Sequence, residues 1–204
     1  MYKKIFLTLI LAILINLQYY ICFSSEIHDK QLFNDWHSYL LTNNDNSTVI
    51  QIATFNKEND TNFLIIQMTP GDCNSYILKS VTMDKNFKDE GVLDIPGAIR
   101  IDKRNIYDIN VKAVAEKGCL TKYIKFKGHN NFIDDCINGD YLRIQYKLGD
   151  QFIYEKFSLN GFTNAFNRCK WFCNNLVPKK NKSNDEDFFK SKRGNNNSEQ
   201  VDNL

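Results

Sequence analysis

The sequence predicts a mostly β fold: an antiparallel β-sandwich-like domain that ends in a C-terminal amphipathic helix. Three observations lead to this prediction. Residues 141–148 alternate strictly between apolar and polar side chains, several other runs are rich in β-branched and aromatic residues, and the apolar period changes from two to about 3.6 after Gly161. A period of two is typical of a half-buried strand, and a period near 3.6 is typical of a surface helix.

The clearest element is a hairpin over residues 141–159. Its first strand has four apolar side chains on one face: Leu142, Ile144, Tyr146 and Leu148. Gly149 and Asp150 supply a two-residue turn, and residues 151–159 return as the second strand. Alternation on both sides of such a turn predicts an antiparallel pair with one buried face.

Other runs predict shorter strands, separated by turn residues. A polar lead-in over 26–34 precedes Asp35, which opens the first candidate strand. The charged residues 83–90 predict a loop or a short helix. The remaining strands are expected over 48–55, 62–68, 76–82, 98–102, 106–111 and 121–127. The sequences between them, including residues 56–60 and 70–72, have the composition of turns.

A single helix is expected over residues 161–173. Its apolar stripe consists of Phe162, Ala165, Phe166, Cys169 and Cys173, which lie on one helical face. Asn160 is a plausible N-cap, because its side chain can accept a bond from a free backbone N–H of the first turn. Phe162 and Phe166 are expected to dock this helix on the sheet.

The two ends of the chain are predicted to lie outside the folded domain of residues 26–177. Lys3 and Lys4 precede an apolar run over 5–17, and small residues follow at Ser24 and Ser25. This pattern predicts a signal peptide over 1–25, with a retained N-terminal membrane anchor as the alternative. Residues 178–204 are too polar to bury a core and predict a disordered tail.

The overall charge does not indicate a nucleic-acid partner. The chain has 26 basic and 24 acidic residues, a net charge of +2, and its basic residues are scattered along the sequence among acidic ones. Nucleic-acid binding usually shows a clustered basic stripe, so we expect no nucleic-acid partner.

Five cysteines remain if Cys22 leaves with the signal peptide: Cys73, Cys119, Cys136, Cys169 and Cys173. Export permits disulfides, and an odd number leaves one thiol free or paired between chains. We expect Cys119 to pair with Cys136, because they flank a predicted strand. Cys169 and Cys173 could form a metal or redox pair, but their spacing matches neither chemistry. A core position, or separate partners, is the simpler interpretation.

No set of residues predicts catalysis or a bound metal or cofactor. The histidines His28, His37 and His129 lack the local spacing of metal ligands. Ser158 lacks a nucleophile elbow, and a Cys119–His129 pair would need geometry that the sequence does not supply. Asp94, Asp134 and Asp135 lie beside turn residues, where solvation is the ordinary explanation. We therefore expect a protein that is not an enzyme.

Several short motifs between residues 91 and 170 resemble the invasion-associated locus B family, a group of small exported bacterial proteins. Pro96-Gly97 and Ile101-Asp102 match a turn that leads into a strand, and Gly118-Cys119 matches a following motif. The closing motif is matched in full by Ser158, Leu159, Gly161, Phe162 and Ala165. The family's second cysteine, five residues before its Gly-Cys, is replaced here by Val114.

This resemblance implies a non-enzymatic envelope or secreted protein that supports interaction with, or entry into, host cells. It implies a periplasmic, outer-membrane or secreted location and a partner that is a protein or a host-cell surface component, with membrane association possible through a retained N-terminal segment. A periplasmic binding or inhibitor module, with a protein or small ligand on the sheet face, is the alternative. A thiol-dependent enzyme is a third hypothesis and would require a reactive thiolate.

Overall fold

The structure is a computed structural model that describes residues 25–85, 91–116, 118–128 and 131–176. The predicted signal peptide, apart from Ser25, the predicted tail, the retained-anchor alternative and His129 lie outside these residues. The described strands are β1 (Glu26–Phe33), β2 (Trp36–Thr42), β3 (Thr48–Asn56), β4 (Asn59–Thr69), β5 (Asp72–Met83), β6 (Gly91–Ile101), β7 (Ile106–Glu116), β8 (Cys119–Phe126), β9 (Tyr141–Leu148) and β10 (Gln151–Ser158). The described helices are α2 (Phe132–Ile137) and α3 (Phe162–Asn175).

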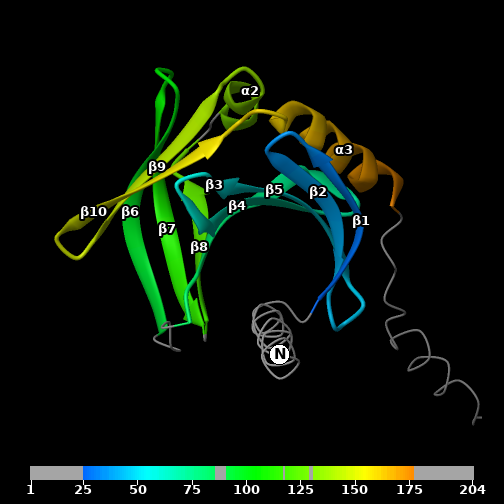
Figure 1. Ribbon diagram of the computed structural model, residues 1–204, viewed down its shortest axis with the longest axis horizontal. Coiled ribbons are helices and arrows are strands. Elements are labelled where there is room, and N and C mark those ends of the chain that lie inside the picture. The colour runs from blue at the N-terminus through cyan, green and yellow to red at the C-terminus, as the bar shows by residue number, and fades with distance from the viewer. Residues whose placement is uncertain (1–24, 86–90, 117, 129–130, 177–204) are drawn as a thin grey trace, which may run out of the picture.

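The strands form one antiparallel sheet in the order β1-β2-β3-β4-β5-β8-β7-β6-β9-β10. This sheet curves so strongly that its two halves face each other, with both helices at one end (Figure 1). The predicted mostly β, antiparallel fold with a C-terminal helix is confirmed. Its sandwich-like layering comes from one continuous curved sheet, because the β8-β7-β6-β9-β10 half folds over the β1–β5 half.

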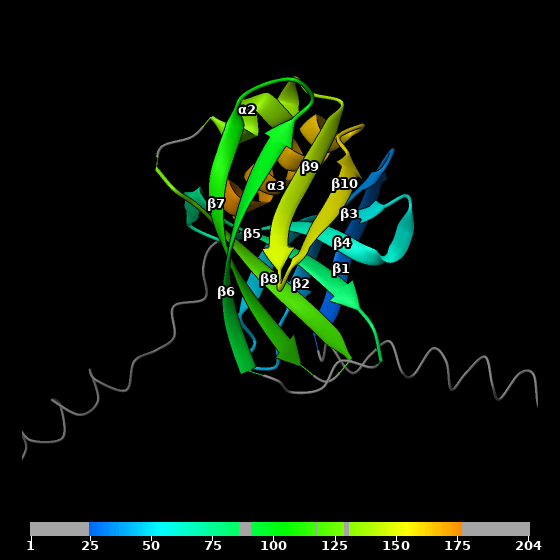
Figure 2. The ribbon, with the colours of Figure 1, turned by 90° about the vertical axis from the view of Figure 1, so that its left-hand side faces the viewer.

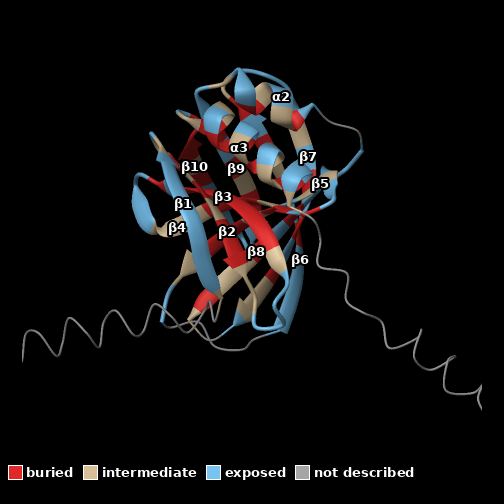
Figure 3. Ribbon diagram, turned by 90° about the vertical axis from the view of Figure 1, so that its right-hand side faces the viewer, coloured by how far each residue is buried: buried red, intermediate tan, exposed pale blue. Residues whose placement is uncertain are grey.

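The core fills the space between the two halves and beneath α3. Alternate residues of each strand point into it, as a half-buried strand requires. Ile50 and Ile52 come from β3, and Ile99 and Leu142 face them from the other half, all at or near complete burial. β1 has exposed residues along nearly its whole length, in contrast to the strands behind it (Figure 3). Burial of this apolar surface is the main stabilising term of the fold.

The helix α3 lies on the β1–β5 half and is fixed there by aromatic contacts. The ring of Phe162 is fully buried, 5.1 Å from the Trp36 ring in an edge-to-face arrangement and 5.5 Å from the Phe166 ring. Ala165 is fully buried too, so a small side chain lets the helix approach the sheet. The predicted apolar stripe and the docking role of Phe162 and Phe166 are confirmed.

Gly161, rather than Asn160, is the N-cap of α3. Its backbone is left-handed, with φ +91°, and a Cβ placed there would lie 1.9 Å from the Phe33 carbonyl oxygen. Only glycine fits a corner that needs both a positive φ and contact with another backbone. The Asn160 side chain instead accepts a 3.0 Å hydrogen bond from Asn34 Nδ2.

Two further sequence predictions are wrong, and one helix was missed. The polar lead-in over 26–34 contains the edge strand β1. The sequence did not reveal this strand, because its side chains are polar on both faces and lack the alternation that marks a half-buried strand. Pro96 and Gly97 lie inside β6 and form no turn. The ladder to β9 begins at Gly97, so the backbone N–H that proline lacks is not needed at position 96. The helix α2 was not expected, because six residues are too few to show a period.

Glycine at position 161 gives the first testable expectation. The Gly161→Ala variant should lose about 3 kcal/mol or more of unfolding free energy, since left-handed strain adds to a clash with backbone. Gly149→Ala is the matched control: φ is +60° but no atom lies within 4 Å of its Cβ. It should lose only about 1 kcal/mol. Urea unfolding measures both, and equal losses would contradict the close approach to Phe33.

Candidate functional site

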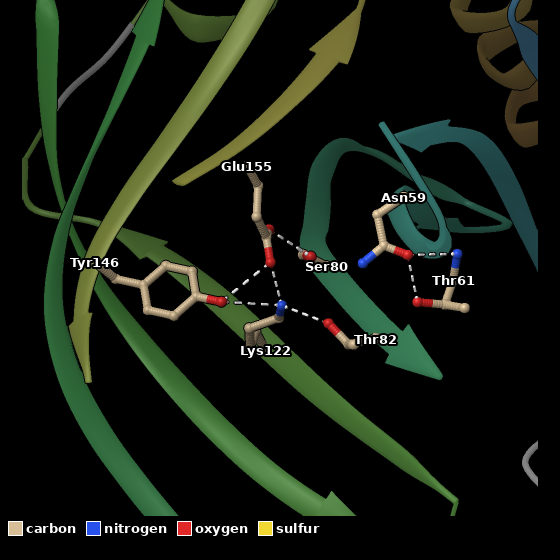
Figure 4. A network of polar contacts seen from close by, with 7 residues as sticks. All are labelled: Asn59, Thr61, Ser80, Thr82, Lys122, Tyr146 and Glu155. Atoms are coloured by element: carbon tan, nitrogen blue, oxygen red, sulfur yellow. Dashed lines mark hydrogen bonds and ion pairs between the residues drawn. The ribbon is translucent and has the colours of Figure 1, made fainter. Parts of the chain in front are cut away.

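The most polar part of the interior is a closed network centred on Lys122 and Glu155. Lys122 Nζ forms a short ion pair with Glu155 Oε1, and each side chain is only 2% exposed. The ammonium also donates to Thr82 Oγ1 at 2.9 Å and to Tyr146 Oη at 3.1 Å. Tyr146 Oη donates to Glu155 Oε1 at 3.0 Å, and Ser80 Oγ donates to Glu155 Oε2 at 2.8 Å. Figure 4 shows these side chains converging from β5, β8, β9 and β10.

Electrostatics identifies this network as a structural bond between the two halves of the sheet. Burial lowers the pKa of Lys122, while the Glu155 carboxylate opposes that shift. Burial, followed by the same carboxylate, raises the pKa of Tyr146. The Glu155 carboxylate accepts from Lys122, Tyr146 and Ser80, and none of these three partners is exposed to solvent. Such a satisfied, closed network fixes geometry and offers no group to a substrate.

A second polar row crosses the opposite face of the β1–β5 half. Tyr39 Oη donates to Gln51 Oε1 at 3.0 Å, and Gln51 Nε2 donates to Gln67 Oε1 at 2.8 Å. Lys79 Nζ donates to the same Gln67 oxygen at 3.1 Å, and burial lowers the pKa of Lys79. Each group has a partner on the neighbouring strand, so this row also serves the sheet.

The cysteines form a disulfide that the sequence did not predict. Cys73 at the start of β5 is bonded to Cys173 in the last turn of α3. Cys136 is a free buried thiol, so the expected Cys119–Cys136 disulfide is wrong, while Cys119 is itself disulfide-bonded. Cys136 lies on α2, and its sulfur packs into the core rather than across a hairpin. Pairing between residues 100 positions apart leaves no local signal in the sequence.

The two free thiols of the described chain are not activated. Burial raises the pKa of Cys136, and burial raises the pKa of Cys169 to about 12 against the smaller effects of Lys170 and Arg168. A catalytic or redox cysteine needs the opposite shift and access to solvent. Cys169 faces the core while Cys173 pairs elsewhere, so the simpler interpretation of that spacing is confirmed.

The other polar residues considered as catalytic lie apart from one another. Ser158 accepts the Trp36 indole N–H on its carbonyl at 2.9 Å. His28 lies on the exposed β1, and His37 on β2 packs edge-to-face on Phe55. Burial lowers the pKa of His37. Each of these residues therefore has different structural neighbours.

The considered carboxylates are also separated. Asp135, in α2, accepts a short hydrogen bond from Tyr107 Oη and lies 3.5 Å from Arg104 Nη1. Asp94 lies on β6 opposite Lys112 of β7, far along the strand from that helix. Within residues 25–85, 91–116, 118–128 and 131–176 there is no group of three or more His, Cys, Asp or Glu side chains that could hold a metal.

The motif residues occupy structural positions. Gly118 is left-handed, with φ +89°, immediately before Cys119 opens β8. Gly97 lets β9 approach, because a Cβ there would lie 2.6 Å from the Gln145 carbonyl oxygen. The closing motif makes the β10–α3 corner. These residues therefore build the fold.

The exposed surface with a distinctive side-chain composition is the outer face of β6, β9 and β10, which faces the viewer in Figure 2. Arg100 lies directly opposite Arg143, and Arg143 lies directly opposite Lys156. Strand pairing thus places three cations in one row across three strands, at a spacing of roughly 4.8 Å between backbones. We call this row, with Tyr141, Phe152 and Tyr154 beside it, the basic–aromatic face.

The cations of this face have no acidic partner in the described chain. Arg100 donates to the carbonyls of Lys103 and Arg104 at 3.2 Å, and Lys156 Nζ lies 4.3 Å from the centre of the Tyr141 ring. The described ion pairs involve none of Arg100, Arg143 and Lys156. Like charges directly opposite on neighbouring strands destabilise a sheet. An anion bound across the row would relieve that repulsion.

Exposed aromatic rings border the cations. Tyr154 is 69% exposed and Phe152 is 55% exposed, and their ring centres are 6.4 Å apart on β10. Tyrosine, phenylalanine and arginine together are typical of the energetic centre of a binding surface. The sequence analysis missed this face, because its cations are 43 and 13 residues apart along the chain and only the register brings them together.

Neither helix of the described chain is long and apolar enough to cross a membrane. No family model, curated protein or solved structure matches the chain.

The buried ion pair leads to a second expectation. Glu155→Gln leaves the Lys122 ammonium buried without its carboxylate and should cost about 3–5 kcal/mol of unfolding free energy. The double variant Lys122→Met/Glu155→Gln should cost clearly less than the sum of the single changes. A urea-unfolding mutant cycle measures the coupling, and simple additivity would contradict the pairing.

The same variant should show a characteristic pH dependence. A lysine with a lowered pKa in the folded state binds fewer protons there than in the unfolded state, so stability rises as the pH approaches the ordinary lysine value near 10.5. Loss of the carboxylate lowers the folded pKa of Lys122 further. Glu155→Gln should therefore gain stability from pH 7 to pH 10 more steeply than the native protein.

The Cys73–Cys173 disulfide encloses a long loop, with a sequence separation of 100. Replacing both cysteines by alanine should lower the unfolding free energy by about 2–5 kcal/mol. Cys169→Ala is the control, because it removes a buried sulfur without opening a disulfide and should cost about 1–2 kcal/mol. Thermal and urea unfolding of both variants test this, and a loss no larger than that of the control would contradict it.

Proposed function

We propose that this chain is a non-enzymatic, exported binding protein that attaches to an anionic component of a host-cell surface through its basic–aromatic face. The observation that carries the proposal is the row of Arg100, Arg143 and Lys156, three directly opposed cations with no carboxylate partner in the described chain. A surface that carries unrelieved like charge is best explained by a partner that supplies the opposite charge.

Two further observations support this proposal. The closing sequence motif resembles that of exported invasion-associated proteins, and the Cys73–Cys173 disulfide fits an oxidising compartment outside the cytoplasm. The buried network around Lys122 and Glu155 is satisfied by its own members, and the free thiols Cys136 and Cys169 have raised pKa values. Binding therefore has more support from the described side chains than catalysis.

The direct test is binding of the purified protein to host cells and to an immobilised sulfated polysaccharide. Arg100→Glu/Arg143→Glu should weaken binding at least about tenfold at physiological salt, because two attractive charges become repulsive. Raising the salt concentration should weaken the native protein in the same direction.

Lys112→Glu/Lys125→Glu is the matched control for this test. It makes the same change in net charge at two exposed lysines of β7 and β8, outside the row. Its binding should stay within about twofold of the native protein. If both double variants bind alike, the face carries no specific site and only net charge matters.

Function in the cell is tested with a deletion strain. Loss of the gene should reduce entry into host cells, and the Arg100→Glu/Arg143→Glu protein should fail to restore it. Normal entry without the gene would count against a host-interaction role. Normal entry together with co-purification of one periplasmic partner would favour a periplasmic binding module instead.

A further inference from the structure

The two edges of the curved sheet are β1 and β10. A free edge offers unpaired backbone donors and acceptors, so natural sheets usually protect it with bulges, charges or a covering element. The two edges of this chain differ in that respect.

The β1 edge is protected. Its pairing with β2 shifts register between His28 and Gln31, and Asp29 there has a positive φ of 49°. The Asp29 carbonyl also accepts a 2.7 Å hydrogen bond from Arg168 Nη2 of α3. A bulge of this kind twists a strand away from any partner.

The β10 edge has none of these protections along its first half. It pairs with β9 through eight consecutive residues without a register shift. Beyond that ladder, no described backbone hydrogen bond involves residues 151–156. Because Leu148 and Gln151 flank a two-residue turn and pair with each other, alternation directs the backbone groups of Phe152, Tyr154 and Lys156 to the free side.

The sequence of this edge is complementary to itself. Consider two copies of β10 that run antiparallel with a two-fold axis at Ile153. Phe152 of each copy then lies opposite Tyr154 of the other, and Asp150 lies opposite Lys156. The side chains of all four residues are at least partly exposed on the strand or at its turn. Aromatic pairs and opposite charges are the two kinds of cross-strand pair that stabilise a sheet.

We propose that two copies of this chain associate through β10, in antiparallel register about Ile153, to form an isologous dimer with a continuous sheet. The charges favour this register over a shifted one: a shift of two residues places Lys156 opposite Phe152 and removes both ion pairs. Each two-fold contact occurs twice, as isologous symmetry requires. The dimer also joins two basic–aromatic faces, which strengthens attachment to a repetitive anionic surface without any new contact.

The interface is small, so association is weak. A seven-residue strand pair with two aromatic pairs lies at the low end of specific interfaces. Sedimentation equilibrium of the purified protein from about 1 to about 500 µM should therefore show a reversible monomer–dimer equilibrium. A protein that stays monomeric throughout this range overturns the proposal.

Charge reversal tests the register. Asp150→Lys places two lysines against each other at both ends of the interface, and Lys156→Asp does the same with two aspartates. Each variant should lose at least about tenfold in association constant. Lys125→Asp is the control, since it reverses an exposed charge on β8, away from the edge, whereas Lys147 pairs with Asp150 and would disturb the interface. It should associate within about twofold of the native protein.

Mixing the two variants is the decisive step. An Asp150→Lys chain carries lysine at positions 150 and 156, and a Lys156→Asp chain carries aspartate at both. An equimolar mixture should form a heterodimer with native-like affinity, which native mass spectrometry resolves from the two homodimers. Failure of the mixture to associate, or undiminished self-association of either variant alone, overturns the proposed register.

Circular dichroism and urea unfolding of each variant show that lost association does not come from unfolding. Binding of the sulfated polysaccharide is read separately with the Asp150→Lys variant, which leaves Arg100, Arg143 and Lys156 in place. Lys156→Asp is not used for this readout, because it removes a cation of the basic–aromatic face. Loss of dimers with retained polysaccharide binding by the monomer supports two independent functions of the surface.

Discussion

The architecture depends on the buried network of Lys122, Glu155 and Ser80, which joins β10 to β8 and to β5. Lys122 is on β8 near the middle of the sheet, and Glu155 is on the last strand, so their bond draws the end of the sheet across to its centre. Ser80 on β5 completes the closure at 2.8 Å. An ion pair in so dry a setting contributes little net free energy compared with apolar residues of the same size. Its value is that, together with the Ser80 hydrogen bond, it fixes how β10 lies against β8 and β5.

The position of α3 follows from that closure. β10 leads directly into the Gly161 corner, and the Trp36 indole donates to the Ser158 carbonyl at 2.9 Å where the two halves meet. Once β10 is fixed, the corner places Phe162 against Trp36, and the helix covers the remaining open side of the core. Helix docking is thus a consequence of strand placement.

The sequence was most informative where structure is local. Alternation and a two-residue turn predicted both strands of the 141–159 hairpin within one residue, and a helical stripe located α3 nearly as well. It failed at β1, whose side chains are polar on both faces, and at Pro96-Gly97, a turn signal that here marks the end of a ladder. In both cases, pairing with a neighbouring strand determined the local structure.

The candidate site could not be predicted by the same reasoning. Arg100, Arg143 and Lys156 form a row only because β6 pairs with β9 in one particular register, and local sequence does not specify which distant strands become neighbours. The partner of Cys73 was hidden for the same reason, since 100 residues separate it from Cys173. The basic residues are scattered along the sequence, and strand pairing brings three of them together on one face.

The covalent link between α3 and β5 also determines how the domain would bear a mechanical load. A pull applied at Leu176, just after α3, passes through Cys173 into Cys73 and so into the interior of the sheet, where β5 has a partner on each side. The helix need not carry the tension, and residues between the two cysteines cannot be extended from that end. A pull on β1 meets only one ladder, whose bonds can break one after another. The domain should therefore be stiff when pulled from its C-terminal side and compliant when pulled from β1.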